Sequence, residues 1–211
     1  MIVPAFTFVS TASAFMLYGA KPVFVDVRQD TLNIDLEQAE AAITPRTRAI
    51  CVVHYGGVAC EMDRLTKLAK DHNLILIEDN AHGLFAKYRG KYLGTFGALA
   101  TQSFHETKNI TCGEGGALVI NDASLAERAE ILREKGTDRT KFLRGQVDKY
   151  TWVDVGSSWV ISDLLAAILF GQLSRADEIY TQRMNIWNRY HNELQTWAAK
   201  HDVTLPTVPE G

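Results

Sequence analysis

The sequence predicts an α/β fold in which helices cover both faces of a β-sheet. Short apolar segments alternate along the chain with segments of helical periodicity, the order expected of an α/β domain. Most of the apolar segments lack polar alternation, which indicates that neither face of the sheet is solvated. Several helical segments also have recognisable capping residues at their ends.

Six segments have the length and apolar character of buried strands. They follow one another at residues 2–5, 23–26, 49–53, 74–79, 99–104 and 117–121. The helices between them begin and end at typical residues. Ser10 or Thr11 can cap a first helix, and Asn33 or Asp35 precedes a second helix that ends before Pro45.

Two more helices are indicated by apolar spacing at 62–69 and after Asp122, the latter with Gly136 just past its end. From Ser162 onward, apolar residues repeat every three or four positions, which predicts one long helix or a kinked pair bridging a large domain to a smaller one. Residues 136–160 are expected to form a long surface loop, and such loops are often functional.

Composition excludes several classes of protein. The 211 residues include 46% hydrophobic and 22% charged residues, and the net charge of -3 argues against a partner bound through charge alone, such as nucleic acid or an anionic membrane. We find no membrane-spanning run, no signal peptide and no metal-binding spacing of histidines. Cys51, Cys60 and Cys112 form no CxxC pair, so we expect reduced thiols and a cytoplasmic protein.

A carboxylate and a lysine follow two of the predicted strands. Asp79 ends the strand 74–79, and Lys108 lies in the loop after the strand 99–104. In α/β sheets, ligands bind outside the carboxyl ends of the strands. A nucleophilic lysine and a carboxylate that keeps a pyridine nitrogen protonated are what pyridoxal 5'-phosphate (PLP) requires. Taken alone, Asp79 could equally cap a helix, and Lys108 could be a solvated loop lysine.

Other residues near these strand ends suit the same cofactor. Ser103 could donate to a phosphate or bond to backbone; His82 could bond to a ring hydroxyl or simply start a helix. Phe8 could stack on a flat ring or belong to the core. The glycine-rich turn at 113–116 matches neither a Walker loop nor a dinucleotide-binding loop.

Five motifs in order give the pattern its specificity. They are Phe6–Thr11, Gly19–Asp26, Glu78–Gly83, Ser103–Lys108 and Gly113–Gly116. Over essentially its whole length, the chain resembles the DegT/DnrJ/EryC1/StrS family of sugar aminotransferases, which are PLP enzymes of fold type I. The resemblance implies a large domain with a mixed, mostly parallel sheet flanked by helices, followed by a small C-terminal domain.

The resemblance also implies roles for individual residues. Lys108 matches the family's Schiff-base lysine, and Asp79 matches the partner of the pyridinium nitrogen. Ser103 matches a phosphate ligand, and Phe8 matches an aromatic residue that covers the ring. His82 stands where many members have Gln beside the ring hydroxyl, so a hydrogen-bonding side chain is kept.

Some features depart from the family pattern. Ser158 lies where many members place an Asn that reaches the phosphate of the neighbouring subunit. Members also have a segment before the first strand and a small C-terminal domain, so we expect this chain to be truncated at both ends. We expect a PLP-binding large domain at 1–160, a bridging helix region at 161–200 and a linker at 201–211.

Later segments narrow the resemblance. Residues 144–152, 156–158 and 162–163 are similar to members that act on dTDP-4-keto-6-deoxyglucose in enterobacterial common antigen synthesis. This implies transfer of an amino group from L-glutamate to a nucleotide-linked 4-keto-6-deoxy sugar by a homodimer. Two alternatives are a sugar dehydratase, in which histidine replaces the lysine that Lys108 retains, and a non-catalytic remnant that binds PLP weakly.

Overall fold

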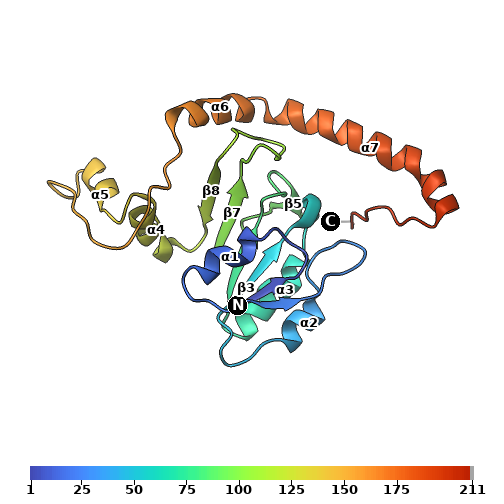
Figure 1. The fold of residues 1–211 in the computed structure, drawn as a ribbon, viewed down its shortest axis with the longest axis horizontal. Helices are drawn as coiled ribbons and strands as arrows, with labels where there is room; N and C mark the ends of the chain where they lie inside the picture. Colours follow the sequence, from blue (N-terminus) through green and yellow to red (C-terminus); the bar gives the residue numbers. More distant parts are fainter. Residues whose placement is uncertain (210–211) are drawn as a thin grey trace.

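The six-stranded sheet at the centre of the molecule is mixed and mostly parallel, which confirms the predicted fold class (Figure 1). A computed structural model describes residues 1–209. The strand order is β2-β1-β3-β4-β7-β8, and only the β7–β8 pair is antiparallel. The strands are β1 (Ile2–Pro4), β2 (Val23–Val25), β3 (Ala49–Val53), β4 (Ile75–Asp79), β7 (Leu99–Ser103) and β8 (Gly116–Ile120). A separate hairpin joins β5 (Lys87–Tyr88) and β6 (Lys91–Tyr92).

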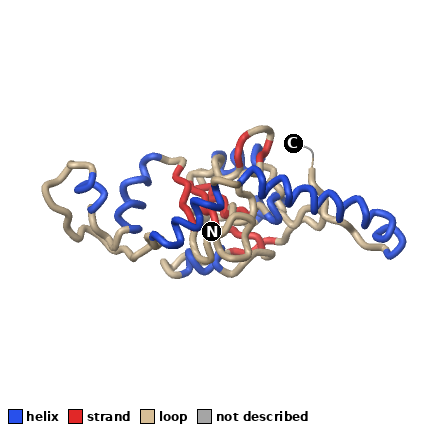
Figure 2. Tube along the Cα trace, turned by 90° about the horizontal axis from the view of Figure 1, so that it is seen from above, coloured by secondary structure: helices blue, strands red, loops and turns tan. Residues whose placement is uncertain are grey.

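The helices follow the predicted order, with one additional helix in the expected loop. They are α1 (Ser10–Met16), α2 (Leu36–Ala41), α3 (Met62–Asp71), α4 (Ala126–Arg133), α5 (Arg139–Leu143), α6 (Asp163–Leu173) and α7 (Ala176–His201), with the 3-10 turns η1 (Tyr55–Gly57) and η2 (Ala123–Leu125). The expected loop at 136–160 contains α5. Of the two forms predicted after Ser162, the structure has the pair, α6 and α7, and α7 extends away from the sheet (Figures 1 and 2).

The end of the chain was expected to be a linker at 201–211. Its last two residues, 210 and 211, lie outside the described residues. Within residues 1–209, no helix combines the length and the apolarity that crossing a lipid bilayer requires.

The helix caps show where local sequence decides and where it does not. Asp35 caps α2, because its carboxylate accepts hydrogen bonds from the backbone N–H groups of Glu37 and Gln38 at 2.9 and 3.1 Å. The predicted cap of α1 is wrong. The N-cap position of α1 is Val9, no side chain caps the helix, and Ser10 and Thr11 lie inside it.

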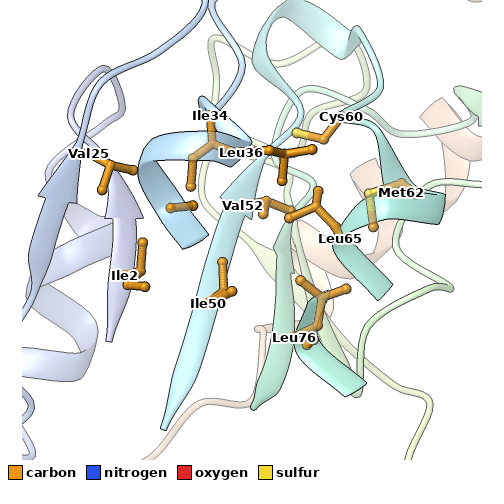
Figure 3. Packing of buried hydrophobic residues seen from close by; sticks show 12 residues of the cluster. Ile2, Val25, Ile34, Leu36, Ile50, Val52, Cys60, Met62, Leu65 and Leu76 are labelled. Carbon is orange, nitrogen blue, oxygen red and sulfur yellow. The ribbon is translucent and has the colours of Figure 1, made fainter. Parts of the chain in front are cut away.

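Alternating side chains divide the core between the two faces of the sheet. On one face, α2 and α3 pack on a large buried cluster (Figure 3) that includes Ile50, Val52 and Leu76. On the other face, a smaller cluster containing Cys51 and Ile77 packs against Phe15 of α1. The prediction of burial on both faces therefore holds for the central strand β3, whereas the edge strands β2 and β8 are partly exposed, with Phe24 at 55% and Leu118 at 49%.

Glu78 is a buried carboxylate in this apolar setting. Its side chain is 0% exposed, and Oε1 accepts hydrogen bonds from the N–H groups of Phe96 and Gly97, both at 2.7 Å. Oε2 accepts from Gly94 N–H at 2.7 Å and pairs with Nε2 of His54 at 3.0 Å. The carboxylate therefore joins the end of β4 to the residue after β3 and to the loop that leads into β7.

The tautomer of His54 follows from its second nitrogen. Nδ1 accepts a hydrogen bond from the backbone N–H of Cys60, so the ring proton lies on Nε2 and is donated to Glu78. Burial by itself would raise the pKa of the Glu78 carboxyl. The hydrogen bonds from His54, Gly97 and Gly94 outweigh burial and hold the pKa below its ordinary value.

We predict that Glu78→Gln destabilises the protein by about 3 kcal/mol at pH 7, because an amide nitrogen cannot accept the bonds made to Oε2. Urea unfolding monitored by circular dichroism measures the change. Glu178→Gln is the control, since this exposed residue pairs only with α7 neighbours, and it should change the unfolding free energy by less than about 0.5 kcal/mol.

The effect of pH on stability gives a second measure of the same carboxylate. Because the folded-state pKa of Glu78 is lowered, its stabilisation is complete above the ordinary pKa of 4.5 and is lost as the pH falls through the lower folded-state value. Between pH 5 and pH 3, wild type should lose stability more steeply than Glu78→Gln. Parallel profiles would contradict this account.

Candidate active site

Three parallel strands end near one edge of the sheet, and β7 continues two residues beyond the ends of β3 and β4. The register pairs Val53 of β3 with Asp79 of β4, and Asp79 with Thr101 of β7. Side chains alternate along β4, so Asp79 lies on the same face as Ile77, which packs in the cluster on the α1 side. Asp79 therefore faces α1, whereas Glu78 faces the opposite side of the sheet.

A cavity of about 340 Å³ opens near this edge. Its volume lies at the lower end of the range for small-molecule sites, roughly 300–1,000 Å³. Three residues expected from the sequence, His82, Ser103 and Lys108, come together in its wall. The lining residues are Gly56, Ala81, His82, Leu84, Ser103, Thr107, Lys108, Asn109 and Ile110.

Lys108 lies on a loop that is held at both ends. Phe104 N–H donates to Gly115 O at 2.8 Å where the loop leaves β7 and returns to β8, and Lys108 N–H donates to His105 O at 2.9 Å. Phe104, Ile110 and Cys112 are buried beneath the loop, against residues of α6 and α7. Within residues 1–209, Nζ of Lys108 has no hydrogen bond or ion pair, so the amine is available to a ligand.

His82 is oriented by the turn η1. The backbone N–H of Gly56 donates to Nδ1 of His82 at 3.1 Å, which places the ring proton on Nε2, where it can be donated to a ligand. Asn33 fixes this turn, because its side-chain oxygen accepts from Tyr55 N–H at 3.0 Å and its amide donates to Val58 and Ala59.

The pKa of His82 lies below its ordinary value. Burial is the main cause, and the positive charge of Lys108 acts in the same direction, whereas the negative charge of Asp79 acts against them. All three side chains are therefore close enough to interact electrostatically, although Asp79 itself does not line the cavity.

Asp79 is held by two hydrogen bonds. Oδ1 accepts from the backbone N–H of Ala81 at 3.1 Å, and Oδ2 accepts from the hydroxyl of Thr11 at 2.7 Å. From sequence, Thr11 is expected only as an alternative to Ser10 for the helix cap, and no local signal indicates a bond to a residue 68 positions along the chain.

Two residues that were expected to bind the cofactor do not line the cavity. Phe8 is 76% exposed. Ser158 is exposed on the segment between α5 and α6, where its backbone forms an isolated antiparallel β-bridge with Glu134. The aromatic ring next to His82 is that of Tyr55, at a centroid distance of 5.3 Å, with Phe6 packed on it at 4.7 Å. Tyr55 follows β3 almost directly, and that position could have indicated it.

The side chains that line the cavity indicate which class of ligand it could bind. The polar side chains that line it belong to His82, Ser103, Thr107, Lys108 and Asn109, and no carboxylate is among the described lining residues. These groups suit a small anionic ligand with several hydrogen-bond acceptors and a carbonyl that an amine can attack. In the described part of the chain, no three His, Cys, Asp or Glu side chains are grouped so that they could hold a metal ion.

The mutual effects of these charges can be tested without any ligand. Lys108→Met should raise the pKa of His82, because it removes a positive charge that disfavours the imidazolium ion. Asp79→Asn should lower that pKa, because it removes a favourable negative charge. The pH titration of the His82 ring protons by NMR measures both. A control, Lys141→Met, removes a partly buried lysine paired with Glu127 and should leave the titration unchanged. Equal titration in all variants would show that the three groups are not neighbours.

The chain is similar to known proteins in both sequence and structure. The Bacillus subtilis spore coat polysaccharide biosynthesis protein SpsC is 37% identical over 92% of this chain and 51% of its own length. The chain thus spans about half the length of the curated relatives it matches. Helicobacter pylori PseC, an aminotransferase of pseudoaminic acid biosynthesis, superposes with a TM-score of 0.84 at 31% identity, over 92% of this chain and 51% of PseC.

Two further similar structures were solved with a ligand or cofactor. DesI, solved in the presence of its TDP-sugar product, is 38% identical with a TM-score of 0.73, over 84% of this chain and 43% of DesI. The PLP form of the putative sugar aminotransferase Spr1654 from Streptococcus pneumoniae is 28% identical with a TM-score of 0.80, over 92% and 53%. The model of the DegT/DnrJ/EryC1/StrS aminotransferase family matches residues 1–210, and the chain belongs to this family.

Proposed function

We propose that the protein takes part in PLP-dependent transfer of an amino group to a nucleotide-linked keto sugar. The observation that carries the proposal is the meeting of Lys108, His82 and Ser103 in one cavity wall, with Asp79 at the adjoining strand end. Membership of a family of aminotransferases related to polysaccharide biosynthesis enzymes supports it.

The residues present fit PLP. Lys108 would hold the aldehyde carbon, Asp79 the pyridine nitrogen, His82 the ring oxygen and Ser103 the phosphate. When bound, PLP supplies an electron sink that lets an amino group move between two carbon skeletons. Nε2–H of His82 is a donor suited to an anionic oxygen. Nζ of Lys108 has no partner among residues 1–209, so it can accept and return a proton at the carbon that bears the amine.

We propose dTDP-4-keto-6-deoxyglucose as the acceptor and L-glutamate as the donor, which would give a dTDP-4-amino-4,6-dideoxygalactose product. The support comes from segments 144–152 and 156–158 and from the TDP-sugar bound by the relative DesI. The proposed place is the cytoplasm, which suits three free cysteines that are all buried.

We also propose that the working site forms between two copies in a homodimer. Phe8 and Ser158 are exposed in the single chain and lie away from its cavity. Both positions suit contacts that a second subunit completes, with Ser158 reaching the partner's cofactor phosphate and Phe8 covering the ring. In this arrangement residues 1–160 would form the PLP-binding domain, and residues 161–200 would be the bridging helix region.

Borohydride reduction with PLP tests the cofactor assignment. Wild type should gain a stable pyridoxyl adduct on Lys108, identified by peptide mass spectrometry, and Lys108→Ala should gain none at that position. Lys141→Ala is a matched control, because Lys141 is ion-paired with Glu127 far along the chain from the cavity, and it should react as wild type does. An adduct spread over surface lysines would overturn the assignment.

Turnover of dTDP-4-keto-6-deoxyglucose with L-glutamate tests the reaction. Lys108→Ala should lower turnover by at least roughly 10³-fold, because no other described lining residue is an amine. An adduct on Lys108 without turnover would favour the alternative of a PLP-binding protein that does not catalyse. Formation of a dehydrated sugar in place of a C4 amine would favour the dehydratase.

A further inference from the structure

We propose that Thr11, backed by Thr7, is a positioning residue that holds the carboxylate of Asp79 in the orientation needed to meet a pyridine nitrogen. The inference rests on the proposed function, in which Asp79 has that role. Two short contacts link the three side chains. Oγ1 of Thr11 lies 2.7 Å from Oδ2 of Asp79, and Oγ1 of Thr7 lies 2.7 Å from Oγ1 of Thr11.

The direction of this chain of hydrogen bonds follows from chemistry. An ionised carboxylate only accepts hydrogen bonds, so the hydroxyl proton of Thr11 points to Asp79. With its one proton used, Thr11 can only accept from Thr7. The order of donation is therefore Thr7 to Thr11 to Asp79, and it ends on a charged acceptor, the stronger kind of hydrogen bond.

The position of Thr11 is unusual for a hydroxyl at a helix start. It lies in the first turn of α1 and is 5% exposed, yet no side chain caps this helix. The two heavy substituents on its β-carbon restrict χ1 of threonine to few rotamers, and the hydrogen bonds to Asp79 and Thr7 select the one observed for Thr11. The hydroxyl that could have capped the helix is directed to the strand end instead.

The consequence for Asp79 is that both of its oxygens are fixed. The terminal torsion of an aspartate side chain is broad and is not fixed by intrinsic preference. Ala81 N–H on Oδ1 and Thr11 on Oδ2 remove that freedom from opposite ends of the carboxylate. A carboxylate has about four acceptor positions, so capacity for a further N–H donor remains.

Pyridine-labelled PLP gives a readout that is independent of turnover. In the full chain, ¹⁵N NMR of bound [¹⁵N]PLP reports how far the ring nitrogen is protonated. Thr11→Val keeps the shape and removes the hydroxyl; it should move the ¹⁵N signal toward that of unprotonated PLP and weaken PLP binding about tenfold. Thr11→Ser should restore both, and Thr7→Val should have a smaller effect in the same direction.

Thr66→Val is the matched control. Oγ1 of Thr66 bonds only to the backbone of its own helix α3, at Met62 O and Asp63 O. This variant should leave the ¹⁵N signal and the PLP affinity unchanged. If Thr11→Val and Thr66→Val give the same signal and affinity as wild type, the proposal is overturned.

A double-mutant cycle without cofactor separates this inference from the proposed function. Thr11→Val and Asp79→Ala are combined, and the unfolding equilibrium constant is measured for each variant. A coupling factor of about ten between the two sites supports the positioning contact, whether or not PLP binds. Additive effects overturn it. Coupling in a chain that shows no PLP binding would keep the positioning contact and reject the proposed function.

Discussion

The buried carboxylate of Glu78 is the contact on which the geometry of the site depends. Its two oxygens bind the residue after β3 and three backbone amides of the loop before β7, so one side chain joins the ends of β3 and β4 to the start of β7. The candidate active site lies at that same edge. A charge removed from water is tolerated there because every described contact supplies a donor.

Two adjacent carboxylates have opposite tasks because side chains alternate along a strand. Glu78 is directed to the side of α2 and α3, where it is buried and structural. Asp79 is directed to the side of α1, where Thr11 and Ala81 hold it beside the cavity. A shift of one residue in the register of β4 would exchange these two environments, so the apolar pattern of the strand also selects the functional acid.

Much of this could be predicted from sequence, because it depends on local patterns. Apolar runs indicated the six strands. Asp35 was one of two predicted caps for α2, and a kinked pair was one of the two forms predicted after Ser162. The motifs around Lys108 and His82 predicted that both residues serve one ligand site, and both side chains line one cavity in the structure. That Ser103 lies with them follows from its position at the end of β7.

The features that could not be predicted depend on contacts between distant segments. The bond from Thr11 to Asp79 joins residues 68 positions apart, and the bond from Gly56 to His82 joins residues 26 positions apart. Local preference favoured Thr11 as a helix cap, and tertiary packing overrode it. The exposure of Phe8 likewise depends on what covers α1, which a residue pattern does not specify.

The closed loop between the antiparallel strands β7 and β8 affects how fast the Lys108 amine can react. The loop that holds Lys108 is closed at its base by the bond between Phe104 and Gly115, and its underside is buried. Its backbone therefore has little conformational entropy left to lose when a ligand arrives. Only rotation about the side-chain bonds of Lys108 is needed to bring the amine to the electrophile, and this restriction raises the effective molarity of the amine.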